Sequence, residues 1–509
     1  MSAILEVEEV ERFRQAISSH LGLQFEDAKV GLLEEVLRRR LHATGRSCTS
    51  YLHYIQSEPV VAEFGALADE LTVPETYFFR HINQFHAFAQ LVLPERMKER
   101  SDERRLRILS AGCASGEEAY TLAILLREVL DPNWDASVLA VDLNPTVLGK
   151  AQRGRFSTWS LRETPLAAQQ QWFKQDAREV VLDDEIRMAV RFEQHNLAGD
   201  DPGLWDEEKF DVIFCRNVMM YFTPEHGRAL IERISQALFP GGYLFLGSAE
   251  TLRGLTNDFH LCHTHETFYY QRKADLAQSI AGPPGAVVRP DRDSYALASL
   301  VEETETWVDA IHKATERVQQ LVEELPSNAV ARKPVNGVRN HSQRGFARAL
   351  ELLQEEHFVE ALDLVEALPP EVAGDADVLL LQAVLMTHAG FLTRAEEACQ
   401  RLLRIDELSA GAHYVLALCH EGMGDFSAAV DHDRMAAYLD PHFAMPQLHL
   451  GLLARRAGDL AGMRGELTLA VALLEHEDSS RLLLFGGGFS RDALIALCRA
   501  EILASEGTT

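Results

Sequence analysis

Three stretches in the C-terminal third of the chain repeat at a fixed interval, and this period constrains the fold more than any other feature. The stretches THAGFLTRAEEA, EGMGDFSAAVDH and RRAGDLAGMRGE align on Gly390, Gly424 and Gly458, which stand 34 positions apart. A small residue precedes each of these glycines by seven positions: Ala383, Ala417 and Gly451. Such a unit cannot bury its apolar face alone, so the period predicts stacked pairs of helices.

The repeated unit resembles the tetratricopeptide repeat, whose period is 34 residues. Ala349 and Ala361 stand 34 positions before Ala383 and Ala395 and mark a fourth, degenerate unit. We therefore expect a solenoid of repeats over 341–475 and a capping segment over 476–509. In that segment, LFGGGFS lacks the Lys-Ser/Thr of a phosphate loop, and Ser490 is expected to N-cap a last helix. The concave face of such an array predicts a protein or peptide ligand.

The region before the repeats alternates short apolar runs with helical stretches. LRILSAG, SVLAVD, FDVIFCRN and GYLFLGSAE read as buried strands, and EEAYTLAILLREVL and PEHGRALIERISQAL read as helices. This alternation predicts an α/β fold with a doubly wound sheet over 101–273. Apolar residues at helical spacing predict an all-α domain over 1–100. Proline and glycine predict a linker over 274–340, which also contains a helical segment.

Charge and apolar content limit the partners of the chain. A formal net charge of −28 over 509 residues disfavours nucleic acid, because affinity for phosphate comes from neutralising cations. The seven cysteines include no CxxC pair, which is typical of reduced thiols. The acidic N-terminal stretch is unlike a signal peptide, and no apolar run is long enough to span a bilayer. We therefore expect a cytoplasmic protein that does not insert into a membrane.

The loop AGCASG, between the first predicted strand and its helix, suggests a ligand. Gly112 and Gly116 let the backbone approach a ligand closely, and ligands bind at the carboxyl edge of such sheets. Glu117 at the helix start would repel a pyrophosphate but attract an ammonium. S-adenosylmethionine has an ammonium and a sulfonium and no phosphate, so we predict this cofactor. The alternative is that Glu117 and Glu118 only complement the helix dipole.

Other polar residues follow the next predicted strands. Asp142 ends the second strand and is placed to accept both ribose hydroxyls, although it is also a candidate N-cap for the helix NPTVLGKAQRG. Asn196, in the stretch HNL, is placed to hydrogen-bond an adenine edge. Arg216 and Asn217 leave the end of the fourth strand, and Tyr221 lies one helical turn further on.

Taken together, these stretches resemble a known family. LTVPETYFFRH, SAGCASGEEAY, AVDLN, HNL and FCRNVMMYF, in this order, are similar to the CheR-type chemotaxis receptor methyltransferases from about residue 10 to 273. The resemblance implies a class I methyltransferase fold behind an all-α domain. It also implies transfer of a methyl group from S-adenosylmethionine to glutamate side chains of a methyl-accepting chemoreceptor.

The resemblance also implies roles for particular positions. Arg80 and Tyr221 are expected at the reaction centre, where Tyr221 approaches the methyl group. The residues expected to line the cofactor are Thr76, Arg80, Gly112, Glu117, Asp142, Asn196, Leu197, Arg216 and Asn217. Pro74 departs from the family, which often has an asparagine there that touches the cofactor.

The expected chemistry needs little acid–base catalysis. A glutamate substrate is ionised at neutral pH, so placement of its oxygen would supply most of the effect. Arg80 would orient that carboxylate or hold the cofactor. The basic triplet Arg38, Arg39 and Arg40 is expected to dock an acidic, helical receptor segment, unless it is simply a solvated face.

Three alternatives accompany this hypothesis. The stretch HLCHTHE offers histidines and a cysteine, but alternation along a strand would split them between two faces, so we expect no metal site. A scaffold that binds the cofactor without transferring methyl groups is a second possibility, and Pro74 is its only support in the sequence. A methyltransferase that acts on a small molecule is the third.

Overall fold

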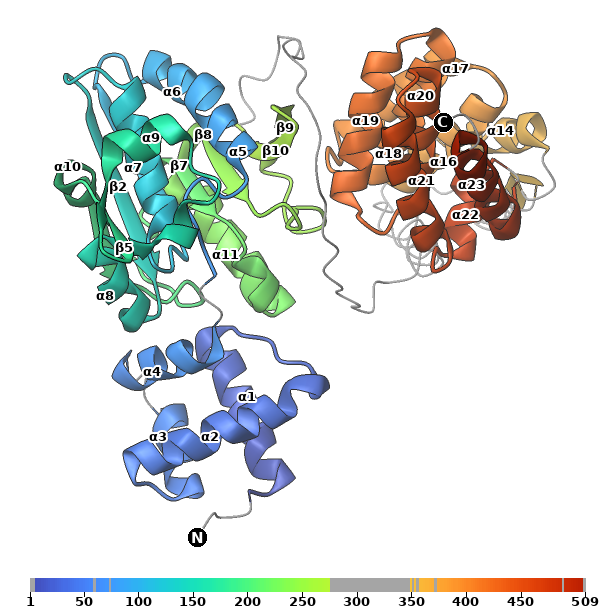
Figure 1. Ribbon diagram of the computed structural model, residues 1–509. Helices are drawn as coiled ribbons and strands as arrows, with labels where there is room; N and C mark the ends of the chain where they lie inside the picture. The colour runs from blue at the N-terminus through green and yellow to red at the C-terminus, as the bar shows by residue number, and fades with distance from the viewer. Residues whose placement is uncertain are drawn as a thin grey trace, which may run out of the picture. The chain divides into compact units, whose positions relative to one another are not determined.

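The computed structural model divides into two compact units, Met1–Arg292 and Asp293–Thr509 (Figure 1). The residues that it describes are 5–57, 61–72, 75–274, 348–349, 352–353, 357–369, 373–487 and 489–506. Beyond residue 274, the predicted linker over 274–340 lies outside the described residues. Pro74 lies outside them as well.

The first unit begins with a small helical domain. Its helices are α1 (Val7–Leu21), α2 (Val30–Thr44), α3 (Cys48–Ser57) and α4 (Val61–Leu71), with a short 3-10 turn η1 (Asp27–Lys29). Phe13, Ile17 and Leu37 belong to its buried core. Helix α1 ends where Gly22 adopts a left-handed conformation (φ 70°), which glycine adopts without strain.

A seven-stranded sheet forms the centre of the first unit. Its strand order is β6-β2-β1-β7-β8-β10-β9. The first five strands of that order run parallel, and β10 runs antiparallel to β8 and β9. The strands are β1 (Arg105–Ala111), β2 (Asp135–Asp142), β6 (Val190–Gln194), β7 (Phe210–Cys215), β8 (Leu238–Leu246), β9 (Phe259–Thr264) and β10 (Thr267–Arg272). The predicted doubly wound sheet is confirmed, and its parallel strands read as continuous apolar runs because both of their faces are buried.

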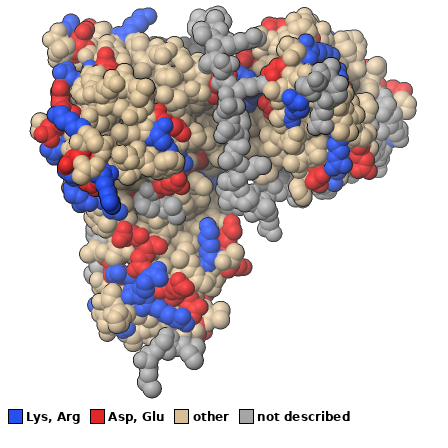
Figure 2. All heavy atoms as spheres, in the orientation of Figure 1, with Lys and Arg blue, Asp and Glu red and all other residues tan. Residues whose placement is uncertain are grey.

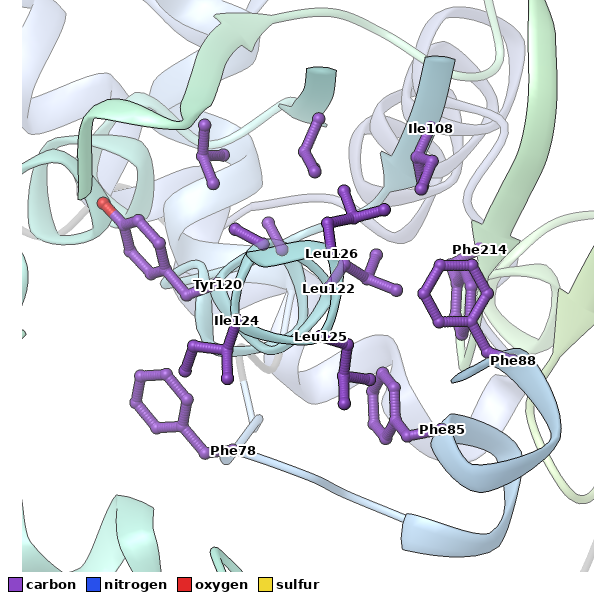
Figure 3. Packing of buried hydrophobic residues seen from close by; sticks show 14 of the residues in the cluster. Phe78, Phe85, Phe88, Ile108, Tyr120, Leu122, Ile124, Leu125, Leu126 and Phe214 are labelled. Carbon is purple, nitrogen blue, oxygen red and sulfur yellow. The ribbon is translucent and has the colours of Figure 1, made fainter. Parts of the chain in front are cut away.

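Helices connect the strands and bury their apolar sides on the sheet. The crossover helices are α7 (Glu117–Val129), α8 (Pro145–Arg153) and α11 (Pro224–Ala237). Leu122, Ile124 and Leu126 of α7 lie in the core (Figure 3). A small antiparallel sheet, β3-β5-β4, lies between α8 and β6 in the sequence and was not predicted. Its region comprises β3 (Arg155–Ser157), η3 (Thr158–Leu161), α9 (Leu166–Trp172), β4 (Phe173–Asp176), β5 (Glu179–Leu182) and α10 (Asp184–Met188).

The segment before β1 packs on the sheet rather than on the N-terminal helices. It contains α5 (Ile82–Ala87), a π-helical turn η2 (Phe88–Val92) and α6 (Leu93–Glu99). The ring of Phe85 stacks on that of Phe214 at 5.7 Å, and the Gln84 amide donates to the Leu246 carbonyl at 2.8 Å. The sequence placed the end of the all-α domain at residue 100, whereas these contacts join Gln84 and Phe85 to the sheet. Helical periodicity alone did not show which core the helices join.

The second unit is an array of helix pairs. The helices α16 (Ala376–His388), α18 (Ala410–Met423) and α20 (Ala444–Arg456) begin 34 residues apart, and each precedes a partner helix. Gly390, Gly424 and Gly458 all have positive φ angles, between 78° and 86°, so the aligned glycines mark the turns within the pairs. The other helices of the unit are α14 (Phe358–Glu366), α17 (Leu392–Leu403), α19 (Phe426–Leu439), α21 (Leu460–Leu474), α22 (Ser479–Phe485) and α23 (Arg491–Glu506).

The small residues of the repeat lie where paired helices touch. A Cβ atom added to Gly451 would lie 2.5 Å from a methyl carbon of Leu467 on the paired helix. Ala383, Ala395, Ala417 and Ala429 are fully buried. The predicted tetratricopeptide-like array is thus confirmed. The capping segment has one helix more than predicted, since α22 precedes the helix that Ser490 caps through the Ala493 N–H.

Candidate functional site

The loop between β1 and α7 is a tight turn that only glycine permits at two positions. Gly112 and Gly116 have φ angles of 76° and 93°. A Cβ atom on Gly112 would lie 2.5 Å from Val218 Cγ2, and one on Gly116 would lie 2.9 Å from Ala151 Cβ. The N–H of Gly112 donates to the Val141 carbonyl at 2.8 Å. The loop is therefore fixed to the ends of the neighbouring strands. The two glycines add no side chain of their own to its backbone.

Glu117, the first residue of α7, is a buried carboxylate with only 3% of its surface exposed. Its Oε2 accepts the hydroxyl of Ser115 at 2.7 Å. Among the ion pairs of the described residues, none includes Glu117. Burial raises the pKa of this carboxyl group, against the effect of the Ser115 hydrogen bond. A ligand cation is the counterpart that this carboxylate would favour.

Its neighbour Glu118 has a different environment. Glu118 accepts the hydroxyl of Ser110 at 2.7 Å and lies 3.5 Å from the guanidinium of Arg216. The Nη2 of Arg216 donates to the carbonyl of Arg80 at 2.6 Å. Arg216 therefore ties the segment around Arg80 to the end of β7. The contact of Arg216 with the cofactor that the sequence predicted stays a prediction.

Asp142 lies at the carboxyl end of β2, beside the glycine loop. Its Oδ2 accepts the Ala114 N–H and its Oδ1 accepts the Asn144 N–H, both at 2.9 Å. Asn144, and not Asp142, caps α8 by accepting the N–H groups of Thr146 and Val147. The alternative role as helix cap is thereby excluded for Asp142. Each carboxylate oxygen retains acceptor capacity for a ribose hydroxyl.

Asn196 makes contacts other than those predicted. Its Nδ2 donates to the carbonyl of His20 at 2.7 Å, and its Oδ1 accepts the Ala198 N–H at 3.0 Å. In this arrangement the side-chain amide joins the end of α1 to the loop after β6. The hydrogen bond of Asn196 to an adenine edge stays a prediction. The neighbouring Leu197 is buried.

The loop after β7 carries Asn217 and Tyr221. Asn217 adopts a left-handed conformation (φ 57°), which asparagine tolerates better than most residues. Tyr221 ends the short 3-10 turn η4 (Met219–Tyr221). Its carbonyl accepts the Gln24 N–H at 2.8 Å, and Phe222 pairs with Leu23 as a single antiparallel bridge. The segment after α1 therefore lies against the loop that carries Tyr221.

Glu250 is a further residue of this region, which sequence reasoning missed. It follows β8, is almost fully buried, and accepts the backbone N–H groups of Gly247, Asn217 and Val218 at 2.7, 2.7 and 2.9 Å. One carboxylate thus joins the ends of β7 and β8. The available sequence signal was an acid directly after a predicted strand, in GSAE, which is the same signal that Asp142 gave.

Arg80 and Thr76 lie in the segment that precedes α5. The Nη1 of Arg80 donates to the carbonyl of Glu75 at 3.0 Å, and its guanidinium lies 5.8 Å from the ring centroid of Tyr77. Thr76 is half-buried in the same segment. The carbonyl of Arg80 is the contact that links this segment to Arg216 and hence to Glu118.

The basic triplet on α2 divides into two kinds of residue. Arg40 forms a bidentate pair with Glu63, with both contacts at 2.8 Å, and only 16% of its side chain is exposed. Its guanidinium is therefore a structural tie between α2 and α4, and the docking role predicted for it is not supported. Arg38 pairs with Glu34 and Arg39 with Glu70 nearer the surface. Figure 2 shows basic and acidic side chains intermixed on this helical domain.

The fold and the site define a class I S-adenosylmethionine-dependent methyltransferase, preceded by an all-α domain and followed by a repeat array. Residues 8–72 match the family model of the CheR methyltransferase all-alpha domain. Residues 74–268 match that of the CheR methyltransferase SAM binding domain. The chain belongs to the CheR methyltransferase family, and its methyl donor is S-adenosylmethionine.

Relatives support both the catalytic part and the whole arrangement. The chain is 28% identical over 460 residues to "Probable biofilm formation methyltransferase WspC" of Pseudomonas putida, covering 89% of this chain and 96% of the relative. It is 33% identical over 270 residues to "Chemotaxis protein methyltransferase 2" of Vibrio cholerae, covering 51% and 91%. The crystal structure of PcrH from Pseudomonas aeruginosa aligns with 28% of this chain and 96% of its own, at 20% identity and a TM-score of 0.23.

Several residues at the sheet edge fit the cofactor. The bare backbone at Gly112 and Gly116 provides a close approach, and Glu117 offers a buried carboxylate to the ammonium. Asp142 has free acceptor capacity for the ribose. No cluster of His, Cys, Asp or Glu within the described ranges has the arrangement of a metal site. None of the helices described is long and apolar enough to cross a membrane.

Proposed function

We propose that this enzyme transfers a methyl group from S-adenosylmethionine to glutamate side chains of a chemosensory receptor, and that it works in the cytoplasm. The observation that carries the proposal is the joint presence of both CheR family domains and a sheet edge whose two acids, Glu117 and Asp142, meet the needs of the cofactor. The names of the relatives concern chemotaxis and biofilm formation, which favours a receptor as the substrate over a small molecule.

Residues of the chain bind and orient the cofactor. When bound, S-adenosylmethionine supplies a methyl group on a positively charged sulfur. Glu117 holds the ammonium end, Asp142 holds the ribose, and Leu197 provides apolar surface for the base. The glycine loop excludes side chains from the space between these groups, so that the cofactor lies in one orientation.

Two residues face the substrate in this proposal. The receptor glutamate is already ionised at neutral pH, so no side chain needs to remove a proton. Arg80, in a segment that Arg216 and Glu118 hold, steers the carboxylate by charge-assisted hydrogen bonds. Tyr221 borders the methyl group, and its loop is fixed by Glu250 and by the segment after α1. These contacts hold Arg80 and Tyr221 in position. Orienting the substrate carboxylate toward the methyl group is the main contribution of the protein to catalysis.

The receptor contacts are proposed for the exposed part of α2. Arg38 and Arg39 form surface pairs that contribute little to stability, so an acidic receptor helix can replace their partners at low cost. Arg40 stays with Glu63. The repeat array is proposed to bind a protein ligand of its own.

A methyl-transfer assay tests the proposal. The full-length protein is incubated with tritiated S-adenosylmethionine and a cytoplasmic receptor fragment, and base-labile label is counted on the receptor. We expect transfer by the wild type and its loss in the Asp142→Asn variant. Cofactor binding without transfer to any candidate receptor supports a scaffold instead. Label that appears only in the small-molecule fraction supports the other alternative.

A further inference from the structure

Helix α22 lies in an unexpected place for its position in the sequence. The first helices of the three complete pairs begin at Ala376, Ala410 and Ala444, and the next one in this register would begin at Asp478. Helix α22 begins at Ser479, but it contacts α16, three repeat intervals back, while α23 packs on α21. In a solenoid each repeat touches only its neighbours along the array. Helix α22 thus lies against the side of the array that α16 and α18, the first helices of their pairs, form, and we call this side the inner face.

Phe485, the last residue of α22, fills a slot on that inner face. Its ring lies 5.7 Å from the ring of Tyr414 and 5.0 Å from that of Phe443, measured between centroids. A Cβ atom on Gly411 would lie 3.0 Å from Phe485 Cζ and 3.1 Å from a methyl carbon of Leu380. We call this surface, formed by Leu380, Gly411, Tyr414 and Phe443, the aromatic slot. The residues that form the aromatic slot come from three successive repeats.

Polar contacts fix the same segment at the edge of the slot. The Oε2 of Glu477 accepts the N–H of Ala444, at the start of α20, at 2.7 Å. The Nη2 of Arg481 lies 2.9 Å from Asp440 Oδ2, and its guanidinium lies 5.2 Å from the centroid of Phe443. The segment thus combines one buried ring with an arginine one helical turn before it, which is how a short peptide anchors itself in a groove.

We propose that the aromatic slot is a binding site for a short helical segment of a partner protein, with an aromatic residue and an arginine four residues before it. In this structure α22 occupies the site in cis. A seven-residue helix is too short to be stable alone, so α22 owes its order to the slot. Gly486 and Gly487 follow it directly, and α23 keeps its own contact with α21. Departure of α22 therefore leaves the rest of the array in place.

Binding of a labelled peptide tests this proposal with the full-length protein. The probe is a synthetic peptide of residues 476–489. The wild type is expected to bind it weakly, because α22 competes at high effective concentration. The Phe485→Ala variant is expected to bind it at least tenfold more tightly. A peptide that carries the same Phe→Ala change should not bind. Phe489→Ala is the matched control, because Phe489 lies in the same segment but is 63% exposed, and it should leave the affinity unchanged.

Hydrogen exchange of the unmodified protein is a second test, which does not depend on whether the Phe485→Ala variant folds. Amides of 479–485 are expected to exchange at least a hundredfold faster than those of α18, since a displaceable segment opens without the array. Protection equal to that of α18 would show that α22 is an integral part of the core and would overturn the proposal. So would failure of the peptide to bind a folded Phe485→Ala variant, or a dimer formed by exchange of α22 between two copies.

Discussion

The carboxylate of Glu250 accepts the backbone N–H of Asn217 at 2.7 Å, and so the loop after β8 holds the loop after β7. The same carboxylate accepts the N–H groups of Val218 and Gly247. Hydrogen bonds to an ionised acceptor are stronger than neutral ones. A single buried side chain therefore fixes the backbone that leads to Tyr221.

Glu250→Gln is expected to slow methyl transfer more than it weakens cofactor binding. The amide has one oxygen for several N–H donors and places its own N–H₂ against them, which costs about 2 kcal/mol of folding free energy. We expect kcat to fall at least tenfold, with a smaller change in the dissociation constant of S-adenosylmethionine. Steady-state kinetics and calorimetry measure the two effects. Glu232→Gln, an exposed carboxylate on α11, is the control and should match the wild type.

Glu117→Gln is expected to weaken binding of S-adenosylmethionine by about tenfold to one hundredfold. A charge-assisted hydrogen bond contributes about 1.5–3 kcal/mol, and each 1.4 kcal/mol is a factor of about ten. Methylthioadenosine lacks the ammonium and serves as the control ligand. Its affinity should be the same for wild type and variant. An equal loss for both ligands would show that Glu117 acts on the loop and not on the ammonium.

Cofactor binding is expected to depend on pH through the same carboxylate. Burial raises the pKa of Glu117, and only the ionised form attracts a cation. Affinity should therefore be complete above this raised pKa and fall as the pH drops through it. Titrations between about pH 5 and 8 should show a smaller pH dependence in Glu117→Gln. Asp142, whose pKa burial also raises, is expected to contribute to the dependence that remains.

Gly112→Ala is expected to abolish cofactor binding and to lower the melting temperature. Its Cβ would lie 2.5 Å from Val218 Cγ2, and its φ of 76° is strained for alanine. Gly149→Ala is a matched control within α8, where a Cβ meets only the end of the Arg153 side chain at 4.0 Å. That change should stabilise the protein by up to about 1 kcal/mol. Calorimetric scans and cofactor titration of both variants make the comparison.

The stability of the repeat array is expected to fall at high pH. His449 lies 2.6 Å from Asp433 and 3.0 Å from Glu421. Burial opposes its protonation, but the hydrogen bonds to these carboxylates outweigh burial and raise its pKa to about 9. A raised pKa of a cation stabilises the fold below the unfolded value, and this effect is lost as the pH rises through about 9. Burial raises the pKa of the partner Asp433 to about 7, so the decline above that pH belongs to His449. Unfolding monitored by circular dichroism between about pH 7 and 10 should show the decline.

Two variants separate this pair from general alkaline effects. Asp433→Asn with His449→Gln removes the charges together, and the decline in that pH range should become smaller. His476→Gln replaces an exposed histidine and should leave the decline as it is in the wild type. If stability declines at high pH as much in the double variant as in the wild type, titratable groups other than His449 and Asp433 cause the decline.

Some features followed from local sequence, and others did not. The glycine loop and Asp142 were predictable, because the order of strand, loop and helix places them at one edge of the sheet. The contacts of Asn196 with His20, of Arg40 with Glu63 and of Glu250 with Asn217 were not. Each joins segments far apart in the chain, and no spacing in the sequence says which loops will meet. For the same reason, the contact of α22 with α16 could not be predicted from the sequence.

By itself, the sequence determined the elements and their order. The 34-residue period set the helix pairs, and apolar runs between amphipathic helices set the parallel sheet with two acids at its edge, because periodicity and turn chemistry act over short distances. Only the tertiary structure decided which polar groups are available to ligands. Asn196, Arg216 and Arg40 bind protein groups, whereas Glu117 belongs to no ion pair within the described residues. These contacts join segments distant in the sequence, so only the folded chain sets which charges are paired.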